Sequence, residues 1–158
     1  MLYFILKYLH VVGAAVLLGT GAGIAFFMLM AHLYAKPALI AGVARIVVIA
    51  DFMFTATAVV LQPITGALLV LQGGYSFWEG WIIWSVLLFV LTGALWLPVV
   101  WMQIRLRDLA AKASAEGTPL PDNYHRIFWL WFAFGVPAFA AVGAILWFMV
   151  AKPQLPLS

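Results

Sequence analysis

One histidine near the start of the chain is the side chain whose type and setting best suit a cofactor ligand. At 100° per residue along a helix, His10 shares a face with Lys7 and with the small residues Gly13 and Ala14. Neutral imidazole is a common axial ligand of haem iron, and small neighbours leave room for a flat molecule. Lys7 lies one turn nearer the chain start, where it would meet a propionate. This pattern predicts that haem b or a porphyrin binds here, with His10 as the metal ligand.

A simpler interpretation of His10 stays open. Close to a membrane surface, the imidazole would be satisfied by water or by a backbone carbonyl, and Lys7 would extend its ammonium group to the interface. The other two histidines do not help a haem, because His10 and His32 are about 33 Å apart along an unbroken helix. We therefore expect one histidine ligand per chain.

A second polar group is expected at the depth of His10. Gln62 and Pro63 interrupt the apolar run LQPITG, and an amide in lipid needs a partner. Gln62 would either line a pocket together with His10 or make an interhelical hydrogen bond that holds two helices together.

A polar cluster is expected nearer the other membrane face. Asp51 lies about two turns inside the apolar segment, where an unpaired carboxylate is unfavourable. Its expected neighbours come from two other segments: Gln103, Arg105, His125 and Arg126. A structural ion-pair cluster is the favoured interpretation, and a proton-relay or substrate role is the alternative.

The composition excludes several function classes. Hydrophobic residues make up 67% of the 158 residues and charged residues 8%, and the net charge is +3. Because there is no cysteine, disulfides and thiolate chemistry are excluded. The sequence has no phosphate-binding glycine loop, no HExxH motif and no basic stripe of the kind that binds nucleic acid, so the lipid bilayer is the expected partner.

These side chains must be positioned by membrane helices. A helix needs about 20 mainly apolar residues to cross a bilayer, and four segments qualify: 3–30, 46–71, 80–103 and 127–151. We expect an all-α, four-transmembrane-helix bundle forming a single domain. Residues 104–126 form its longest connection, the first part of which extends the third helix to near Gly117.

The basic residues predict an orientation. Two connections hold most of them, and the other side has only Lys7 and Lys152. The positive-inside rule then places both basic connections in the cytoplasm and both termini outside. The small-residue spacing of Ala15, Gly19 and Gly23 favours close packing within the bundle, with a homodimer as the alternative.

Four motifs in order resemble a family of bacterial predicted integral membrane proteins that is classed as a domain of unknown function. They are LKYLHVVGAAVLLGTG, DFMFTATAVVLQPITG, LWLPVVWMQIRLRDLA and YHRIFWLWFAFGVPAF, and the resemblance covers nearly the whole chain. It implies a multi-pass protein of the bacterial inner membrane. More distantly, the pattern from Lys7 to His10 resembles the first helix of the J-type protoporphyrinogen oxidase and copper-resistance D membrane families. In the oxidase family a first-helix histidine is tied to haem binding, and the resemblance implies that role for His10.

Three functional hypotheses follow. The first is a small haem b or porphyrin protein in which His10, Lys7 and Gln62 surround the cofactor, with electrons passing to or from a quinone. The second is a non-enzymatic accessory or scaffolding subunit of a larger membrane complex. The third is a proton or small-molecule translocator that depends on Asp51.

Overall fold

The chain is built from four long helical rods. The computed structural model describes residues 1–154, and every regular element in that range is helical. The rods are α1 (Leu2–Tyr34), a second rod made of α2 (Pro37–Ala50), the π-helix η1 (Asp51–Thr55) and α3 (Ala56–Gly73), then α4 (Gly80–Glu116) and α5 (Asp122–Ala151). All four rods are long and apolar enough to cross a membrane. The predicted all-helical architecture with four spans is therefore confirmed.

The helices are longer than the apolar segments from which they were predicted. The second rod begins at Pro37 rather than at residue 46, and α4 continues to Glu116, so most of the expected 104–126 connection is helical. Only residues 117–121 separate α4 from α5. Hydropathy marks the part of a helix that lies in lipid, whereas backbone signals mark its ends. Here these signals are a proline at the first position of α2 and Gly117, with a φ of 64°, after α4.

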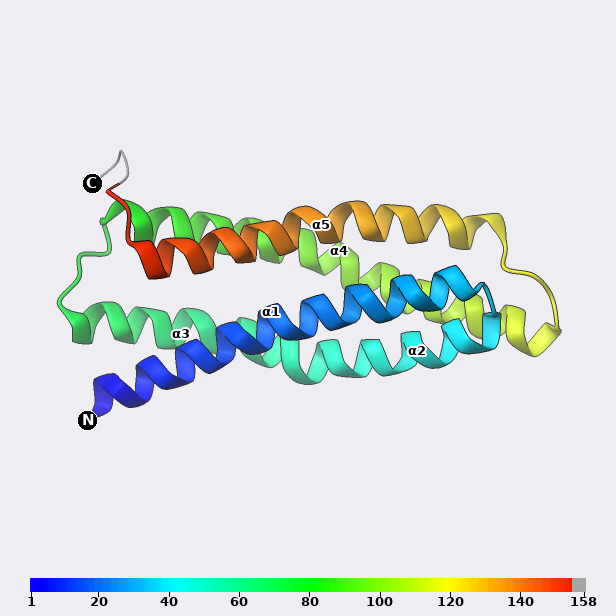
Figure 1. Cartoon of the computed structure of the whole chain (residues 1–158), viewed down its shortest axis with the longest axis horizontal. Coiled ribbons are helices and arrows are strands. Elements are labelled where there is room, and N and C mark those ends of the chain that lie inside the picture. Colours follow the sequence, from blue (N-terminus) through cyan, green and yellow to red (C-terminus); the bar gives the residue numbers. More distant parts are fainter. Residues whose placement is uncertain (155–158) are drawn as a thin grey trace.

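The two ends of the bundle differ. Figure 1 shows the start of α1 and the end of α5 at one end, together with the connection between α3 and α4. We call this the terminal end, and we call the opposite end, with the α1–α2 turn and residues 117–121, the loop end. The arrangement agrees with an even number of crossings.

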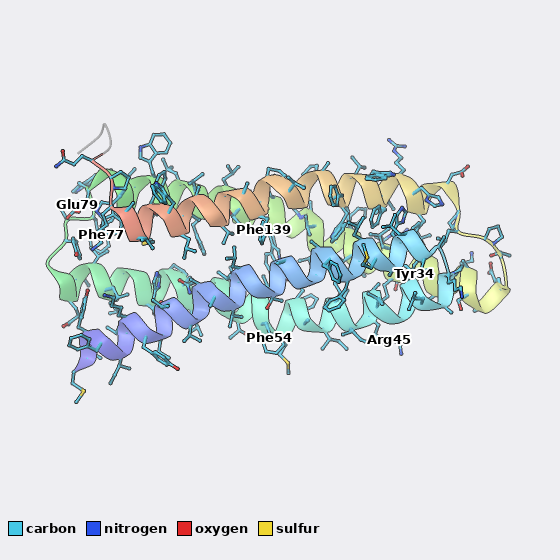
Figure 2. The ribbon with its side chains drawn as sticks, in the orientation of Figure 1. Tyr34, Arg45, Phe54, Phe77, Glu79 and Phe139 are labelled. Atoms are coloured by element: carbon cyan, nitrogen blue, oxygen red, sulfur yellow. The ribbon has the colours of Figure 1, made fainter. Side chains whose placement is uncertain are left out.

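The loop half is tightly packed. A buried cluster joins α1, α2, α4 and α5, and its fully covered side chains include Met28, Ile40, Leu106, Tyr124 and Phe128. Elsewhere, large apolar side chains project from the outer faces of every rod, as Figure 2 shows along the whole bundle. Such an outer surface is suited to lipid rather than to water.

The terminal half is divided into two helix pairs. α1 packs on α3, and α4 packs extensively on α5, but α3 has at most marginal backbone contact with α4 and α5. A small buried cluster of Val70, Trp81 and Ile82 closes the pairs near the α3–α4 connection. Farther in, Phe139 of α5 lies close to α1 (Figure 2). A Cβ added at Gly21 of α1 would lie 3.6 Å from the Phe139 ring. The space left between the pairs is the cleft described next.

Candidate functional site: a cleft between two helix pairs

A large cavity lies between the pair α1–α3 and the pair α4–α5. Its volume is about 1080 Å³, and it extends from residues of the terminal end to η1 in the middle of the second rod. Ligand pockets commonly have volumes of about 300–1,000 Å³. Most lining side chains are apolar, and the few polar ones occur at three levels: the mouth at the terminal end, the level of His10, and the inner end near Asp51.

His10 lines the cleft and is held from α3. Its Nδ1 lies 2.8 Å from the hydroxyl oxygen of Thr65. That hydroxyl has one hydrogen, which it donates to the carbonyl oxygen of Leu61 at 2.8 Å, with Gln62 O also within 3.2 Å. On this basis we assign His10 the tautomer in which Nδ1–H donates to Thr65. The proton thus belongs on Nδ1, and Nε2 keeps its lone pair, with no hydrogen-bond partner among residues 1–154.

Gln62 and His10 are neighbours, as the sequence predicted. Gln62 Nε2 donates a hydrogen bond of 2.8 Å to the backbone carbonyl oxygen of His10, so the amide joins α3 to α1. The glycine at position 13 makes this possible, because a Cβ there would collide with the Gln62 amide nitrogen. Gln62 and Ala14 line the cleft together with His10, whereas Gly13 packs beneath Gln62.

Gly66 provides the space beside the imidazole. A Cβ at this position would lie 3.2 Å from His10 Cε1, which is tighter than most real Cβ contacts. Neither Thr65 nor Gly66 was predicted from the sequence as a site residue. Their only signal was the run QPITG, in which a hydroxyl and a glycine follow the polar kink at helical spacing.

Two lysines line the mouth of the cleft. Lys7 was predicted as a site residue, and its ammonium group lies 6.0 Å from the centroid of the Tyr3 ring. Lys152 was not predicted. It donates a hydrogen bond of 2.5 Å to the Tyr75 hydroxyl and lies 4.2 Å from the centroid of that ring. Its sequence signal was its place just after the fourth span, on the same side of the membrane as Lys7.

The expected polar cluster around Asp51 is only partly assembled. Asp51 and Gln103 both line the inner part of the cleft, but Arg105, His125 and Arg126 are exposed and outside it. No ion pair of Asp51 occurs among the described residues. Its partner is instead Trp96, whose indole N–H donates to Oδ1 at 3.2 Å. The ion-pair expectation therefore needs correction, because the arginines lie on helix faces that turn away from the cleft.

His125 belongs to an aromatic group at the loop end. His32 stacks on Phe128 with ring centroids 3.7 Å apart, and His125 lies 5.7 Å from His32. No group of three or more metal-ligating side chains occurs in the described part of the chain. Of the three histidines in the sequence, His10 alone lines the cleft.

Comparison with known proteins agrees with this architecture. The model of the family described as "Predicted integral membrane protein (DUF2269)" matches residues 4–153. No curated protein and no solved structure matches the chain. The comparisons do not extend the resemblance to the oxidase and copper-resistance families, which stays a prediction. Because the match covers almost the whole chain, this protein is a member of the DUF2269 family of predicted integral membrane proteins.

Proposed function

We propose that this membrane protein binds haem b or a related porphyrin in the cleft, with His10 as the axial ligand, and takes part in electron transfer. The observation that carries the proposal is the hydrogen bond from His10 Nδ1–H to Thr65, which leaves Nε2 available at a large apolar cavity. Histidines that ligate metals usually donate their other ring N–H in this way. The bond fixes the tautomer and ring orientation and raises the basicity of the ligating nitrogen.

The chemistry of the cleft fits such a molecule. The volume of about 1080 Å³ is sufficient for a macrocycle, and the mainly apolar lining would exclude water from its faces. Lys7 and Lys152 at the mouth supply two positive charges for two propionates. Because His32 and His125 lie at the loop end, one chain offers a single imidazole, that of His10, to hold the group.

Each residue then has a stated task. When bound, the haem supplies one-electron chemistry, and its potential depends on the axial ligand, the neighbouring hydrogen bonds and the surrounding dielectric. His10 would hold the group and Thr65 would orient His10. Gly66 would leave space for the imidazole ring. The two lysines would fix the orientation of the porphyrin edge that carries the propionate carboxylates.

A second candidate is an accessory or scaffolding subunit without a cofactor. It is favoured by the bond from Gln62 to the His10 carbonyl oxygen, which ties α1 to α3 in the manner of a purely structural contact. In this case His10 and Thr65 would also serve only helix association. Interhelical hydrogen bonds in membranes contribute about 0.6 kcal/mol on average.

The absorption spectrum of the purified protein separates the two candidates. Full-length protein, extracted in mild detergent from cells supplied with a haem precursor, should show a Soret band that disappears in His10→Ala. His125→Ala is the matched control, because His125 is exposed and outside the cleft, and it should keep the band. Thr65→Val should retain the haem but weaken its binding by about tenfold, as expected for a lost supporting hydrogen bond.

A colourless wild-type protein that is folded, and that takes up no haem on titration, would exclude the haem proposal and leave the scaffolding one. A Soret band that His10→Ala leaves unchanged would place the haem elsewhere and would also contradict the proposed site.

A further inference from the structure

Four buried polar atoms near the inner part of the cleft have no hydrogen-bond partner among the described residues. They are Asp51 Oδ2, Thr55 Oγ1, Gln103 Oε1 and Trp131 Nε1. Each of the four residues is more than nine-tenths buried, and each lines the cavity. Buried polar atoms are nearly always paired in folded proteins, so unpaired atoms that share one cavity indicate that something polar occupies it. We call this region, which is lined by residues of η1, α4 and α5, the inner site.

The unpaired atoms require a ligand that can both donate and accept hydrogen bonds. Trp131 N–H is only a donor and Gln103 Oε1 only an acceptor, while the Thr55 hydroxyl can act as either. Trp96 N–H already occupies Asp51 Oδ1, which leaves Oδ2 as the free oxygen of that carboxyl group. A hydroxyl group at each end of a ligand would satisfy this set, because its oxygen accepts from Trp131 N–H and its hydrogen is donated to Gln103 Oε1 or Asp51 Oδ2.

The spacing of the inner site suits a ring. Trp96 of α4 hydrogen-bonds to Asp51, so the two residues lie at about the same level along the bundle. Gln103 follows Trp96 by seven residues, which is about 10 Å along α4. A six-membered ring with oxygens at opposite positions, and with a hydrogen bond at each end, bridges such a distance. Val99 lies between the two levels on α4 and lines the cavity, so the middle of the site is apolar where the faces of a ring would pack.

The π-helix is the second feature that sets this place apart. Asp51 and Thr55 are the first and last residues of η1, and π-helical turns inside α-helices occur frequently at functional sites. The inner site is also distinct from the His10 level. Asp51 precedes Gln62, the partner of His10, by eleven residues, or about 16 Å along the rod. Ligands at the two levels would therefore lie one beyond the other in the same cleft.

We propose that the inner site binds the ring of a quinone in its reduced form, a quinol, with one hydroxyl donating to Asp51 and the other donating to Gln103 Oε1 and accepting from Trp131 N–H. The apolar tail runs along the cleft and into lipid. The inference deepens the proposed function, since it gives a lipid-soluble electron carrier a place beside the haem. Binding at the inner site depends on residues other than those that would hold the haem.

Calorimetric titration of the full-length protein in detergent tests the site. The probes are a benzoquinone with a single isoprenoid unit and its quinol. The wild type should bind saturably with one site per chain. Gln103→Leu and Trp131→Phe should each raise the Kd of the quinol by about tenfold or more, because Gln103→Leu removes the acceptor and Trp131→Phe the donor of one quinol hydroxyl.

Matched variants keep the result interpretable. Gln72→Leu makes the same exchange at an exposed position outside the cleft and should leave the Kd unchanged. Trp131→Phe removes the N–H but keeps an aromatic ring, so it tests the hydrogen bond even if Gln103→Leu fails to fold. Absence of saturable binding to the folded wild type, or an unchanged Kd in Trp131→Phe, would overturn the proposal and assign the unpaired atoms to water alone.

The haem proposal and the quinone proposal fail separately. His10→Ala should abolish the Soret band yet keep the quinone Kd within about threefold of the wild-type value. If the protein proves to lack haem while the effects of Gln103→Leu and Trp131→Phe persist, the inner site stands and the haem proposal falls. A quinone affinity that is lost in His10→Ala but kept in Trp131→Phe would move the quinone to the His10 level and refute the inner site.

Discussion

His10 could be singled out from the sequence, but its partners could not. An ionisable side chain within an apolar segment is rare enough to be noticed, and the facing Gln62 was expected at the same depth. Thr65 and Gly66 were missed because a threonine and a glycine are ordinary in membrane helices. Their roles depend on how α3 is rotated against α1. That rotation is a property of the packed pair, and an apolar sequence encodes it weakly.

The contact between Gly13 and Gln62 gives a test at this scale. In Gly13→Ala the new methyl group would have to displace the Gln62 amide from the His10 carbonyl oxygen, because the two cannot share the space. We expect a loss of about 1–3 kcal/mol in the free energy of unfolding, the usual range for overpacking. Unfolding of the protein in mixed micelles by a denaturing detergent, followed by circular dichroism, measures this loss.

Gly19→Ala is the control for that experiment. Nothing lies within 4 Å of a Cβ at Gly19, which is on the same helix and is exposed. Its stability should stay within about 0.5 kcal/mol of the wild-type value. Equal losses in both variants would mean that any methyl group added to α1 destabilises the protein, and that the contact of Gly13 with Gln62 is not the cause.

At the scale of elements, hydropathy predicted how many spans exist but not where their helices end. The predicted third span stopped at residue 103, yet α4 continues for more than three further turns to Glu116. The sequence did contain the stop signal at Gly117, followed by prolines, and that expectation is confirmed. The π-helix was not predicted, because a single extra residue in one turn leaves no mark in composition or in average hydropathy.

The two connections at the loop end allow a paired prediction. α1 ends at Ala35 with a φ of 53°, in the left-handed region that favours glycine, whereas α4 ends at Gly117 with a φ of 64°. Ala35→Gly should therefore stabilise the protein by about 0.5–1 kcal/mol, and Gly117→Ala should destabilise it by about 1 kcal/mol. The midpoints of thermal unfolding in detergent should move in opposite directions. A shift of the same sign in both variants would contradict this account of the helix ends.

At the scale of the whole molecule, the sequence predicted a four-span bundle, with a pocket at His10 as one interpretation, but not a long cleft between two helix pairs. The cleft arises because α3 makes almost no backbone contact with α4 or α5, while the loop half closes around Tyr124 and Phe128. Pairwise separation of this kind depends on the crossing angles of long rods. The expected neighbours of Asp51 failed for the same reason: the membrane level was estimated correctly for Gln103, but the helix face was wrong for the arginines.

The orientation in the membrane is a prediction for the molecule as a whole. The basic residues of the loop end should hold that end in the cytoplasm, with both termini outside. Because the chain has no cysteine, single cysteines can be introduced without a background. Both Ser76 at the terminal end and Thr118 at the loop end are exposed. A membrane-impermeant maleimide applied to intact bacterial spheroplasts should label Ser76→Cys, and it should label Thr118→Cys only after lysis. The reverse pattern would invert the assignment.

The five residues of η1 also govern what the rest of the second rod presents to its neighbours. An extra residue within one turn twists everything that follows by roughly 100° compared with an unbroken α-helix. Along this rod, α2 packs on both α4 and α1, whereas α3 packs on α1 and has at most marginal contact with α4. Shortening Asp51–Thr55 by one amino acid would leave each helix intact and yet swing Gln62 and Thr65 away from His10. The length of η1 thus sets how the polar residues at the level of Asp51 are aligned with those at the level of His10, although the two levels consist of different residues.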